Sequence, residues 1–457
     1  MAGQISRRSL IKFFSVAAGT SVAAPFSSWA INERNERIIL PDPIPEKMFK
    51  PLTAITIGAG NRGNVYGNYS VEYPDQLDIV GVAEPISLRN ERYAKLHNIT
   101  KENRFNTWEH VFQKPKFADA VIISTPDRLH YGPCMQALEM GYDVLLEKPI
   151  SPSEQECRDI LAKIKKTGRI VAVCHVLRYA PYFVKVRELI QSHSIGDVVS
   201  LQHLEPIGYD HMSHSYVRGN WHNSKESTPI ILAKSCHDLD ILRWMIGKQS
   251  KSIHAFADLN LFKSSNAPAG STDRCINNCA VEGTCPYSAV EMYLRKKKRL
   301  YVFDLPEDKN KVDDFITDQL KNSNYGRCVY RMDNDQPDHY VTNIVFDNNI
   351  TASFSMEALT SYEGRRTRVM GSTGDIVGDM QKFTMTDFRS NKKTEWGKTT
   401  DSHGGGDWRL VSNWIQAVVK QDPNLLTSTI DQSIESHLMC FAAETSRKEK
   451  KVVDVVM

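Results

Sequence analysis

One short segment limits the folds open to this 457-residue chain. The apolar run 54–57 leads straight into Gly58-Ala59-Gly60-Asn61-Arg62-Gly63, a G-x-G-x-x-G turn. In such a turn the first glycine permits the bend, the second lets a pyrophosphate approach, and the third lets the next helix pack on the strand. The following strand, 78–83, ends in Glu84, 21 residues after Gly63. This combination predicts a dinucleotide-binding βαβ unit.

Glu84 also bears on the choice of dinucleotide. A carboxylate there accepts hydrogen bonds from the adenosine ribose hydroxyls and disfavours a 2′-phosphate, so NAD is expected rather than NADP. Arg89 lies near enough in sequence to leave NADP open. The loop residues expected to bind the cofactor are Gly58, Gly60, Asn61, Arg62 and Gly63.

A lysine stands at the end of another apolar strand, in Val144-Leu145-Leu146-Glu147-Lys148-Pro149-Ile150. Open α/β sheets bind ligands at the carboxyl ends of their strands. Lys148 is therefore a candidate contact of the cofactor and a candidate acid/base, provided that a partly desolvated cleft lowers its pKa. Glu147 is expected to orient Lys148 or contact the cofactor, and Pro149 suits a fixed turn, cis or trans. A solvated ion pair at a surface strand end is the alternative.

Further strands of this domain are expected at 120–124 and 170–174. Thr125, Pro126 and His130 follow the first of these and should border the nicotinamide side of the cofactor, although His130 could equally be a packing histidine. The second strand runs into the sequence 175–181, a plausible hinge to a second domain.

The rest of the chain has a mixed pattern. Alternating or β-branched residues predict strands at 198–203, 252–258, 340–346, 350–356, 366–371 and 375–378, with a hairpin turn at 347–349. Helices are expected at 236–244 and at 431–447, the latter packing across the sheet. A further helix is expected to follow the glycines at 404–406 and to end at 419.

These motifs together resemble the Gfo/Idh/MocA oxidoreductases, the family of glucose–fructose oxidoreductase and inositol dehydrogenase. The resemblance extends from about residue 52 to the carboxyl terminus. It rests on the glycine loop, Glu84, Thr125-Pro126 with His130, Glu147-Lys148-Pro149, Arg178-Tyr179 with Pro181, and Gly196-Asp197-Val198. It implies an α/β protein with a Rossmann domain followed by an α/β domain whose large, mostly antiparallel open sheet covers a sugar site. It also makes a homo-oligomer reasonable.

The resemblance further implies a histidine that contacts the reacting sugar hydroxyl, and His237 matches it. Family members often carry an aspartate four residues earlier, where this chain has Ala233, so the proton path must differ. The alternative is that His237 caps a helix and Asp240 lies on its surface. Residues expected at the substrate are His175, Arg178, Tyr179, Lys234, Asp240 and His403. Asp407, near His403, is expected to cap a helix amino terminus.

Four cysteines fall in a polar segment: Cys275, Cys279, Cys285 and, further on, Cys328. They could bind a structural zinc ion, form two disulfides after export, or stay free. The spacing is not that of a standard zinc ribbon, so these alternatives stay open. No metal is assigned to the catalytic site.

The first 30 residues form a separate signal. Ser6-Arg7-Arg8-Ser9-Leu10-Ile11-Lys12 is a twin-arginine pattern, followed by a weakly apolar run and a small-x-small site at 28–30. The prediction is recognition by the twin-arginine export machinery and a periplasmic location; a basic tail is the alternative. The three charges of this segment account for the formal net charge of +3, so the mature chain is neutral. A neutral chain gives no electrostatic case for nucleic acid or membrane surfaces. No later segment approaches 18 uninterrupted apolar residues, so no membrane insertion is expected.

The predicted organisation is a signal peptide at 1–30, a linker at 31–50, a Rossmann NAD-binding domain at 51–177, and a substrate-binding and oligomerisation domain at 178–457. The predicted activity is NAD-dependent oxidation of a sugar or glycoside hydroxyl, the 3-hydroxyl being one candidate. Because a periplasm lacks a soluble NAD pool, the cofactor should stay bound and be recycled in place. The alternatives are a glycoside hydrolase that works by transient oxidation and elimination, and a non-catalytic NAD-bound sugar sensor.

Overall fold

The computed structural model describes residues 36–37, 50–397 and 405–457. Its first sheet is built from β2 (Leu52–Ile57), β3 (Leu77–Ala83), β4 (Arg104–Phe105), β5 (Ala120–Ile123), β6 (Asp143–Leu146) and β7 (Val171–Val173). The strand order is β4-β3-β2-β5-β6-β7 and all pairs are parallel. This is the Rossmann order, and its reversal beside β2 is where such sheets bind a dinucleotide.

Alternate residues of these strands enter two separate cores, one on each face of the sheet. Ala54 of β2 packs with Tyr66 and Tyr93 on one face, whereas Ile55 packs with Cys134 and Ile160 on the other. Buried parallel strands need such cover on both faces. The helices here are α2 (Asn61–Gly67), α3 (Tyr69–Glu72), α4 (Ser87–Leu96), α5 (Trp108–Phe112), α6 (Tyr131–Glu139) and α7 (Glu154–Thr167).

The second sheet has the order β1-β15-β14-β13-β12-β8-β11-β10-β9-β16. Its strands are β1 (Glu36–Arg37), β8 (Val198–Pro206), β9 (Ser250–Asp258), β10 (His339–Phe346), β11 (Thr351–Glu357), β12 (Arg366–Gly371), β13 (Gly374–Gly378), β14 (Lys382–Asp387), β15 (Lys393–Gly397) and β16 (Val453–Asp454). Most neighbours are antiparallel, and β8 with β11 is a parallel pair. Helices α8 (Pro181–Gln191) and α11 (Cys236–Ile246) contribute to the core on one face of this sheet.

Several shorter elements connect these layers. They include α9 (Tyr209–His211), the π-helix η5 (Met212–Arg218), α10 (Ile230–Ala233) and α12 (Val312–Asn322). Residues 259–338, between β9 and β10, form an excursion that we call the β9–β10 insertion; it carries α12 and the four clustered cysteines.

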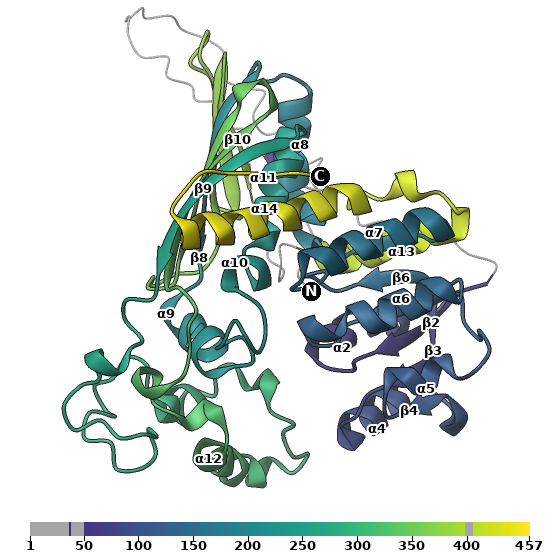
Figure 1. Cartoon of the computed structure of the whole chain (residues 1–457), viewed down its shortest axis with the longest axis vertical. Helices are drawn as coiled ribbons and strands as arrows, with labels where there is room; N and C mark the ends of the chain where they lie inside the picture. Colours follow the sequence, from purple (N-terminus) through teal and green to yellow (C-terminus); the bar gives the residue numbers. More distant parts are fainter. Residues whose placement is uncertain (1–35, 38–49, 398–404) are drawn as a thin grey trace, which may run out of the picture. The chain divides into compact units, whose positions relative to one another are not determined.

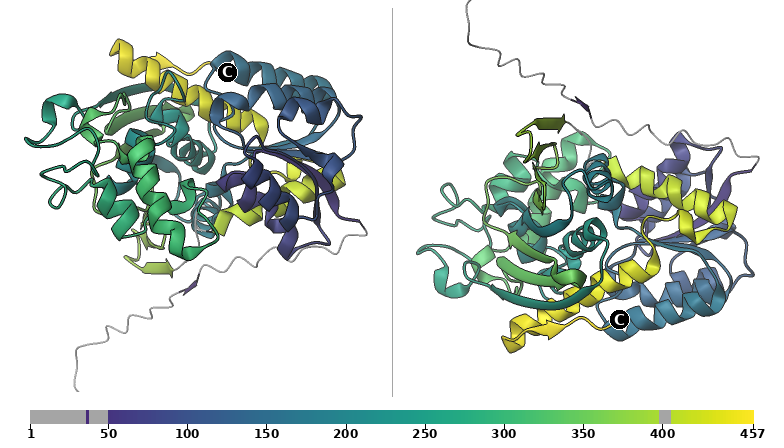
Figure 2. Two further views of the ribbon diagram at one scale, coloured as in Figure 1. Left: turned by 90° about the horizontal axis from the view of Figure 1, so that it is seen from below. Right: turned by 90° about the horizontal axis from the view of Figure 1, so that it is seen from above.

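The carboxyl-terminal helices join the two sheets. Helix α13 (Gly406–Lys420) buries Leu410, Trp414 and Ile415 in the core of the parallel sheet. Helix α14 (Ile430–Glu449) contributes Leu438 to the parallel-sheet core and Met439 to that of the second sheet. Figure 1 shows α14 running from β9 to α7, and both views of Figure 2 place the yellow helices beside the blue helices and the green strands. The chain thus returns to the part built on the parallel sheet. We call this part the first lobe, and the part built on the second sheet the second lobe.

The predicted fold class is confirmed: a Rossmann sheet is followed by an α/β domain with a mostly antiparallel sheet. The expected strands all form, and β12 has the predicted bounds. Strands β1, β4, β14, β15 and β16 were not predicted. Among the described residues, no helix has the length and apolar character needed to cross a membrane. The predicted signal at 1–30, most of the linker and His403 lie outside the described residues.

Candidate active site

The glycine loop has the geometry that a dinucleotide needs. Gly58 has φ of +92°, and a Cβ there would lie 2.8 Å from the backbone of Ser124. A Cβ on Gly63 would lie 2.1 Å from the carbonyl oxygen of Gly58. A Cβ on Gly60 would meet nothing within 4 Å, so the space over Gly60 is open to a ligand. These are the turn, packing and pyrophosphate positions of the motif, and they fit NAD. Asn61, also expected here, is exposed beside the loop.

The acid at the end of β3 lies against this loop. Glu84 is buried; its Oε2 accepts from the Ala59 backbone nitrogen at 2.8 Å and its Oε1 from that of Ile86 at 3.0 Å. The carboxylate therefore stands where the adenosine ribose is expected. Arg89, which left NADP open, has its Nε 2.7 Å from Oδ1 of Asp304 in the β9–β10 insertion. That pairing favours NAD, because the guanidinium already has a carboxylate partner.

Glu147 is held by the glycine-loop helix. Its Oε1 accepts from Arg62 Nε and from the Tyr66 hydroxyl, both at 2.6 Å. Its Oε2 accepts from the backbone nitrogen of Lys148 at 2.7 Å. Burial alone would raise the pKa of Glu147, but the charges of Arg62 and Lys148 outweigh it and leave that pKa lowered. Glu147 therefore orients the Lys148 backbone as an anion, as predicted, and Arg62 serves the same network.

Arg62 extends the network to α13. Its Nη2 donates to Asp407 Oδ1 at 2.5 Å. Gly405, not Asp407, occupies the cap position of α13, and Asp407 lies in the first turn. The predicted capping role of Asp407 is therefore wrong, because its carboxylate pairs with Arg62 across 345 residues of sequence.

Lys148 is half-buried and reaches the second lobe. Its Nζ donates to the carbonyl oxygen of Ala233 at 2.8 Å, and its peptide bond to Pro149 is cis. Ala233 ends α10, immediately before Lys234 and four residues before His237. The bond brings the strand-end amine to the segment that carries His237. The solvated ion pair considered for Lys148 is not what forms.

Three histidine rings cluster behind Lys148. The centroid of His175 lies 6.1 Å from that of His237 and 5.6 Å from that of His437. His175 is fully buried, and burial lowers its pKa to about 4. Burial likewise lowers the pKa of His437 to about 3; its Nε2 accepts from the backbone nitrogen of Ile150 at 2.9 Å. Both rings are neutral at pH 7. His237, the second residue of α11, is buried beside them.

Arg178 and Asp240 pair with each other rather than facing a ligand. Arg178 Nε and Nη2 lie 2.7 and 2.6 Å from the two Asp240 oxygens, and both side chains are at most 1% exposed. Ser436 donates to the same carboxylate, and the remaining Arg178 nitrogen contacts Thr427 and Gln432. Asp240 is thus no helix-surface acid. The structure places this pair in the buried support of the site, where its polar atoms bind other protein groups.

The other predicted substrate residues have separate positions. Tyr179 donates to Asn413 Oδ1 of α13 at 2.9 Å within the parallel-sheet core. Lys234 Nζ lies 3.1 Å from Glu205 Oε1 at the end of β8, and 18% of its side chain is exposed. Lys234 therefore remains beside the site, whereas Tyr179 does not.

The loop after β5 is fixed from two directions. His130 is buried, its Nδ1 and Nε2 lying 2.7 and 2.8 Å from the carbonyl oxygens of Pro149 and Thr125. This matches the packing alternative for His130. Trp221 Nε1 donates to Asp127 Oδ2 at 2.9 Å, so the second lobe also contacts this loop. Pro126 is exposed at the same loop.

A Rossmann sheet whose glycine loop, ribose acid and strand-end lysine are set this way defines an NAD-dependent oxidoreductase. Residues 52–175 match the oxidoreductase family with an NAD-binding Rossmann fold, and residues 187–455 match its C-terminal alpha/beta domain. The chain belongs to this family, Gfo/Idh/MocA, and NAD is its cofactor.

Curated relatives are similar over parts of the chain. An oxidoreductase of Bacillus subtilis, YteT, is 25% identical over 320 residues, which cover 65% of this chain and 71% of the relative. The scyllo-inositol 2-dehydrogenase (NAD(+)) of the same organism is 28% identical over 197 residues, 43% of this chain and 54% of the relative. The 2,7-anhydro-N-acetylneuraminate hydratase of Escherichia coli is 28% identical over 138 residues, 30% of this chain and 36% of the relative.

Solved structures share the fold. Levoglucosan dehydrogenase, in complex with NADH and levoglucosan, has a TM-score of 0.67 at 14% identity and covers 89% of this chain and all of its own. An oxidoreductase of Agrobacterium radiobacter, in complex with NAD+, L-tartaric acid and magnesium, has a TM-score of 0.63 at 13% identity, with 89% of this chain and 99% of its own covered.

Some functional residues were missed from the sequence. The Ala233 carbonyl, His437 and Trp221 each act through a contact with a residue more than 80 positions away. His437 alone had a usable signal, because it lies on the last helix, which was expected to pack across the sheet.

Proposed function

We propose that this enzyme oxidises a hydroxyl group of a sugar or glycoside, with the 3-hydroxyl as one candidate. The observation that carries the proposal is the bond from Lys148 Nζ to the Ala233 carbonyl, beside His237. It fixes the amine at the strand end, next to the loop that borders the nicotinamide, and leaves its other directions for a substrate hydroxyl. Bound NAD supplies the hydride acceptor.

Lys148 holds the substrate hydroxyl and takes its proton in this proposal. His237 is the second proton-transfer group. It takes the role of the aspartate that family members often carry at the position of Ala233. His175 is excluded as the base, because a buried imidazole with a pKa of about 4 is a weak proton acceptor at neutral pH. Arg178 and Asp240 position His175 and α14 rather than bind the sugar.

We also propose export through the twin-arginine route, on the strength of the arginine pair at 7–8. An exported NAD enzyme must keep its cofactor and re-oxidise it in place with a second carbonyl compound. The Arg89–Asp304 pair is one contact that could hold the β9–β10 insertion beside the adenosine end.

The test is the near-ultraviolet absorbance of the mature protein, purified without added NAD and mixed with a panel of sugars and glycosides. A reduced-nicotinamide band that rises on adding a sugar supports oxidation by a resident cofactor. A band that requires added NAD supports the dehydrogenase but contradicts the resident cofactor. No band under either condition contradicts net oxidation, and it leaves a non-catalytic sensor or a transient oxidation followed by elimination, which product analysis separates.

A second candidate is hydrolysis of a glycoside by transient oxidation and elimination. The relative named 2,7-anhydro-N-acetylneuraminate hydratase favours it, because its name describes addition of water. The complete Glu147-Lys148-Pro149 favours the dehydrogenase. Product analysis separates the two: an accumulating keto sugar supports net oxidation, whereas a released aglycone with no lasting keto product supports elimination.

A further inference from the structure

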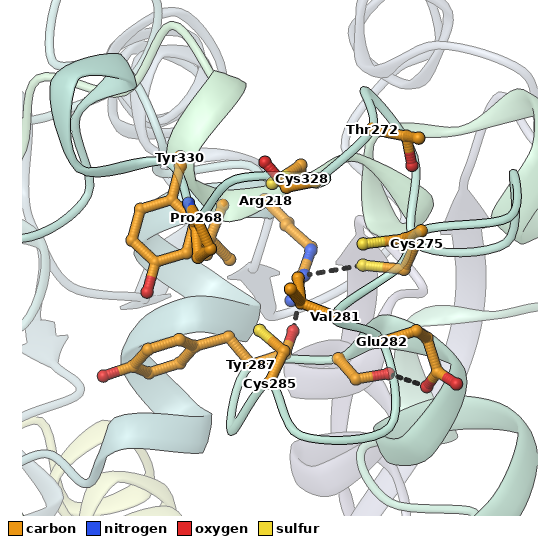
Figure 3. Close-up of a pocket in the computed structure, with 14 residues that line it drawn as sticks. Arg218, Pro268, Thr272, Cys275, Val281, Glu282, Cys285, Tyr287, Cys328 and Tyr330 are labelled. Atoms are coloured by element: carbon orange, nitrogen blue, oxygen red, sulfur yellow. Dashed lines mark hydrogen bonds between the residues drawn. The ribbon is translucent and has the colours of Figure 1, made fainter.

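The β9–β10 insertion contains a small cavity lined by its four cysteines. Cys275, Cys279, Cys285 and Cys328 all border it, and its volume is about 10 Å³, room for one water-sized species. Figure 3 shows the sulfurs of Cys275, Cys285 and Cys328 around the side chain of Arg218. This cavity takes no part in the site described above.

The backbone holds the two cysteine segments together. Residues Arg274 and Arg327 form an antiparallel bridge. On either side of it, the Cys275 nitrogen donates to the Gly326 carbonyl at 3.0 Å, and the Cys328 nitrogen donates to that of Asp273 at 2.8 Å. These backbone hydrogen bonds therefore hold Cys275 and Cys328 next to each other, although they are 53 positions apart in the sequence.

Arg218 is the unusual member of this cluster. It is 1% exposed, its Nε donates to the Arg327 carbonyl at 2.7 Å, and its Nη2 to that of Tyr287 at 2.7 Å and to Cys275 Sγ at 3.6 Å. Its Nη1 has no hydrogen-bond partner. Among the residues that the structure describes, no carboxylate forms an ion pair with it. A buried guanidinium without an anion is costly, so a negative charge is missing here.

The oxidation and metal states of the cysteines differ in the charge they supply. Four thiols or two disulfides are neutral and leave Arg218 uncompensated. Four thiolates around a divalent cation carry a net charge of about −2, which compensates the single positive charge of a buried guanidinium. N–H groups that donate to metal-bound sulfur are the usual outer-shell partners of such sites. The charge of Arg218 thus favours a metal thiolate.

We propose that Cys275, Cys279, Cys285 and Cys328 bind one structural zinc ion, with Arg218 donating to the thiolates. Each cysteine loses its proton to solvent as its sulfur–zinc bond forms. A cavity with room for one water-sized species is large enough for one such ion. No three ligating side chains in the described ranges are already placed around a common point, so binding requires the cysteine side chains to rotate toward it.

The position of the insertion gives the site a structural purpose. The insertion's own core is small, built around residues such as Tyr293 and Ile316. Small cores commonly depend on a metal or disulfide staple. The same insertion supplies Asp304 to Arg89, and its Leu305 carbonyl accepts from Arg92 at 3.0 Å. Zinc would therefore order the segment that reaches the helix beside Glu84.

Elemental analysis of the wild-type protein, purified without chelator, is the first measurement. The expected result is about one zinc per chain and, after cobalt exchange, a thiolate-to-cobalt charge-transfer band. Cys279→Ala, which changes a half-exposed ligand, should lose both signals. Cys134→Ala, on α6 and outside the insertion, should keep them.

Intact mass under denaturing conditions tests the competing states in the wild type, without any variant. A metal-free protein whose mass is lower by two hydrogens for each disulfide overturns the proposal. So does a metal-free protein with nine titratable thiols, or one that contains several irons per chain. Zinc that persists in Cys279→Ala to the same extent as in Cys134→Ala also overturns it.

Discussion

Lys148 owes its place in the site to groups that lie far from it in sequence. Its backbone is fixed by Glu147, which Arg62 and Tyr66 hold from the glycine-loop helix, and its amine is fixed by Ala233. The amine therefore needs no ion pair of its own to stay in position. Removing it should slow the chemistry without disturbing the cofactor site.

Lys148→Ala is expected to lower kcat by about 10²- to 10⁴-fold, the usual contribution of a positioned acid/base group. Binding of NAD should change little, because Glu84 and the glycine loop are untouched. Steady-state kinetics and NAD titration measure the two effects. Lys166→Ala, on the exposed side of α7, is the control and should behave as wild type. Unchanged turnover in Lys148→Ala would instead support a sugar sensor.

Two glycines of the loop should separate stability from cofactor binding. Gly63→Ala places its Cβ 2.1 Å from the Gly58 carbonyl oxygen and should lower the free energy of unfolding by about 1–3 kcal/mol. Gly60→Ala meets no protein atom, at a φ of −75° that alanine adopts, so stability should hold within about 0.5 kcal/mol. Its methyl fills the pyrophosphate position, so NAD affinity should fall by about tenfold or more.

Urea unfolding and NAD titration on both variants check this pair. Equal loss of stability in the two would show that the loop is a general packing feature. Unchanged NAD affinity in Gly60→Ala would contradict the assigned pyrophosphate position.

At this scale the sequence was informative where a motif carries its own geometry. The glycine loop, Glu84 and Lys148 stand where they were expected because they follow directly from strand ends. Arg178 and Asp240 were misjudged for a physical reason: charged residues in a suspected site resemble ligand contacts until their partner, 62 positions away, is known.

Among the helices and strands, α14 supports the site from outside it, through a contact with the segment that follows Lys148. His437 of this helix has its Nδ1 2.7 Å from the Ser433 carbonyl, so the Nε2 that accepts from Ile150 carries no proton. His175, just after β7, packs against the same ring. The contact between α14 and the segment after Lys148 therefore requires neutral histidines.

This requirement predicts a pH dependence of stability. The folded-state pKa values of His175 and His437 are lowered to about 4 and about 3, against about 6.5 for unfolded histidine. Their contribution is fully present above pH 6.5 and is lost as the pH falls toward about 4 for His175 and about 3 for His437, because the unfolded chain then binds more protons. Each ring should contribute a slope of about 1.4 kcal/mol per pH unit within that window.

Urea unfolding between pH 4.5 and about 7 measures the slope. His437→Gln should reduce the slope of the free energy of unfolding against pH by the contribution of about one proton. His193→Gln, which changes an exposed histidine, should leave the slope unchanged. A slope that is the same in His437→Gln and wild type would show that the proton uptake arises elsewhere.

The elements were predictable wherever their apolar period was clear. Strands β8 to β13 alternate and were found, whereas β14 and β15 are largely polar and carry little such signal. Helix α13 has an evident apolar face, but periodicity does not say which of two sheets that face will cover. Only the packed structure shows that it covers the parallel one.

The whole molecule is held together by the return of the chain. Residues of α13 complete the core of the first lobe, and α14 enters both cores. Neither lobe has its full core without the last 50 or so residues. The two lobes should therefore unfold together, even though the family patterns divide them near residue 180.

Trp414 tests this coupling, because it lies fully buried in the parallel-sheet core although it comes late in the chain. Trp414→Ala should lower the free energy of unfolding by about 3–5 kcal/mol through the cavity it leaves. The loss should appear as one earlier transition of the whole protein, with far-ultraviolet circular dichroism and the fluorescence of the remaining tryptophans changing together. Trp408→Ala, a partly exposed change on the same helix, should cost much less. Two separate transitions, with only one displaced by Trp414→Ala, would show that the lobes fold independently and that α13 belongs energetically to the first lobe alone.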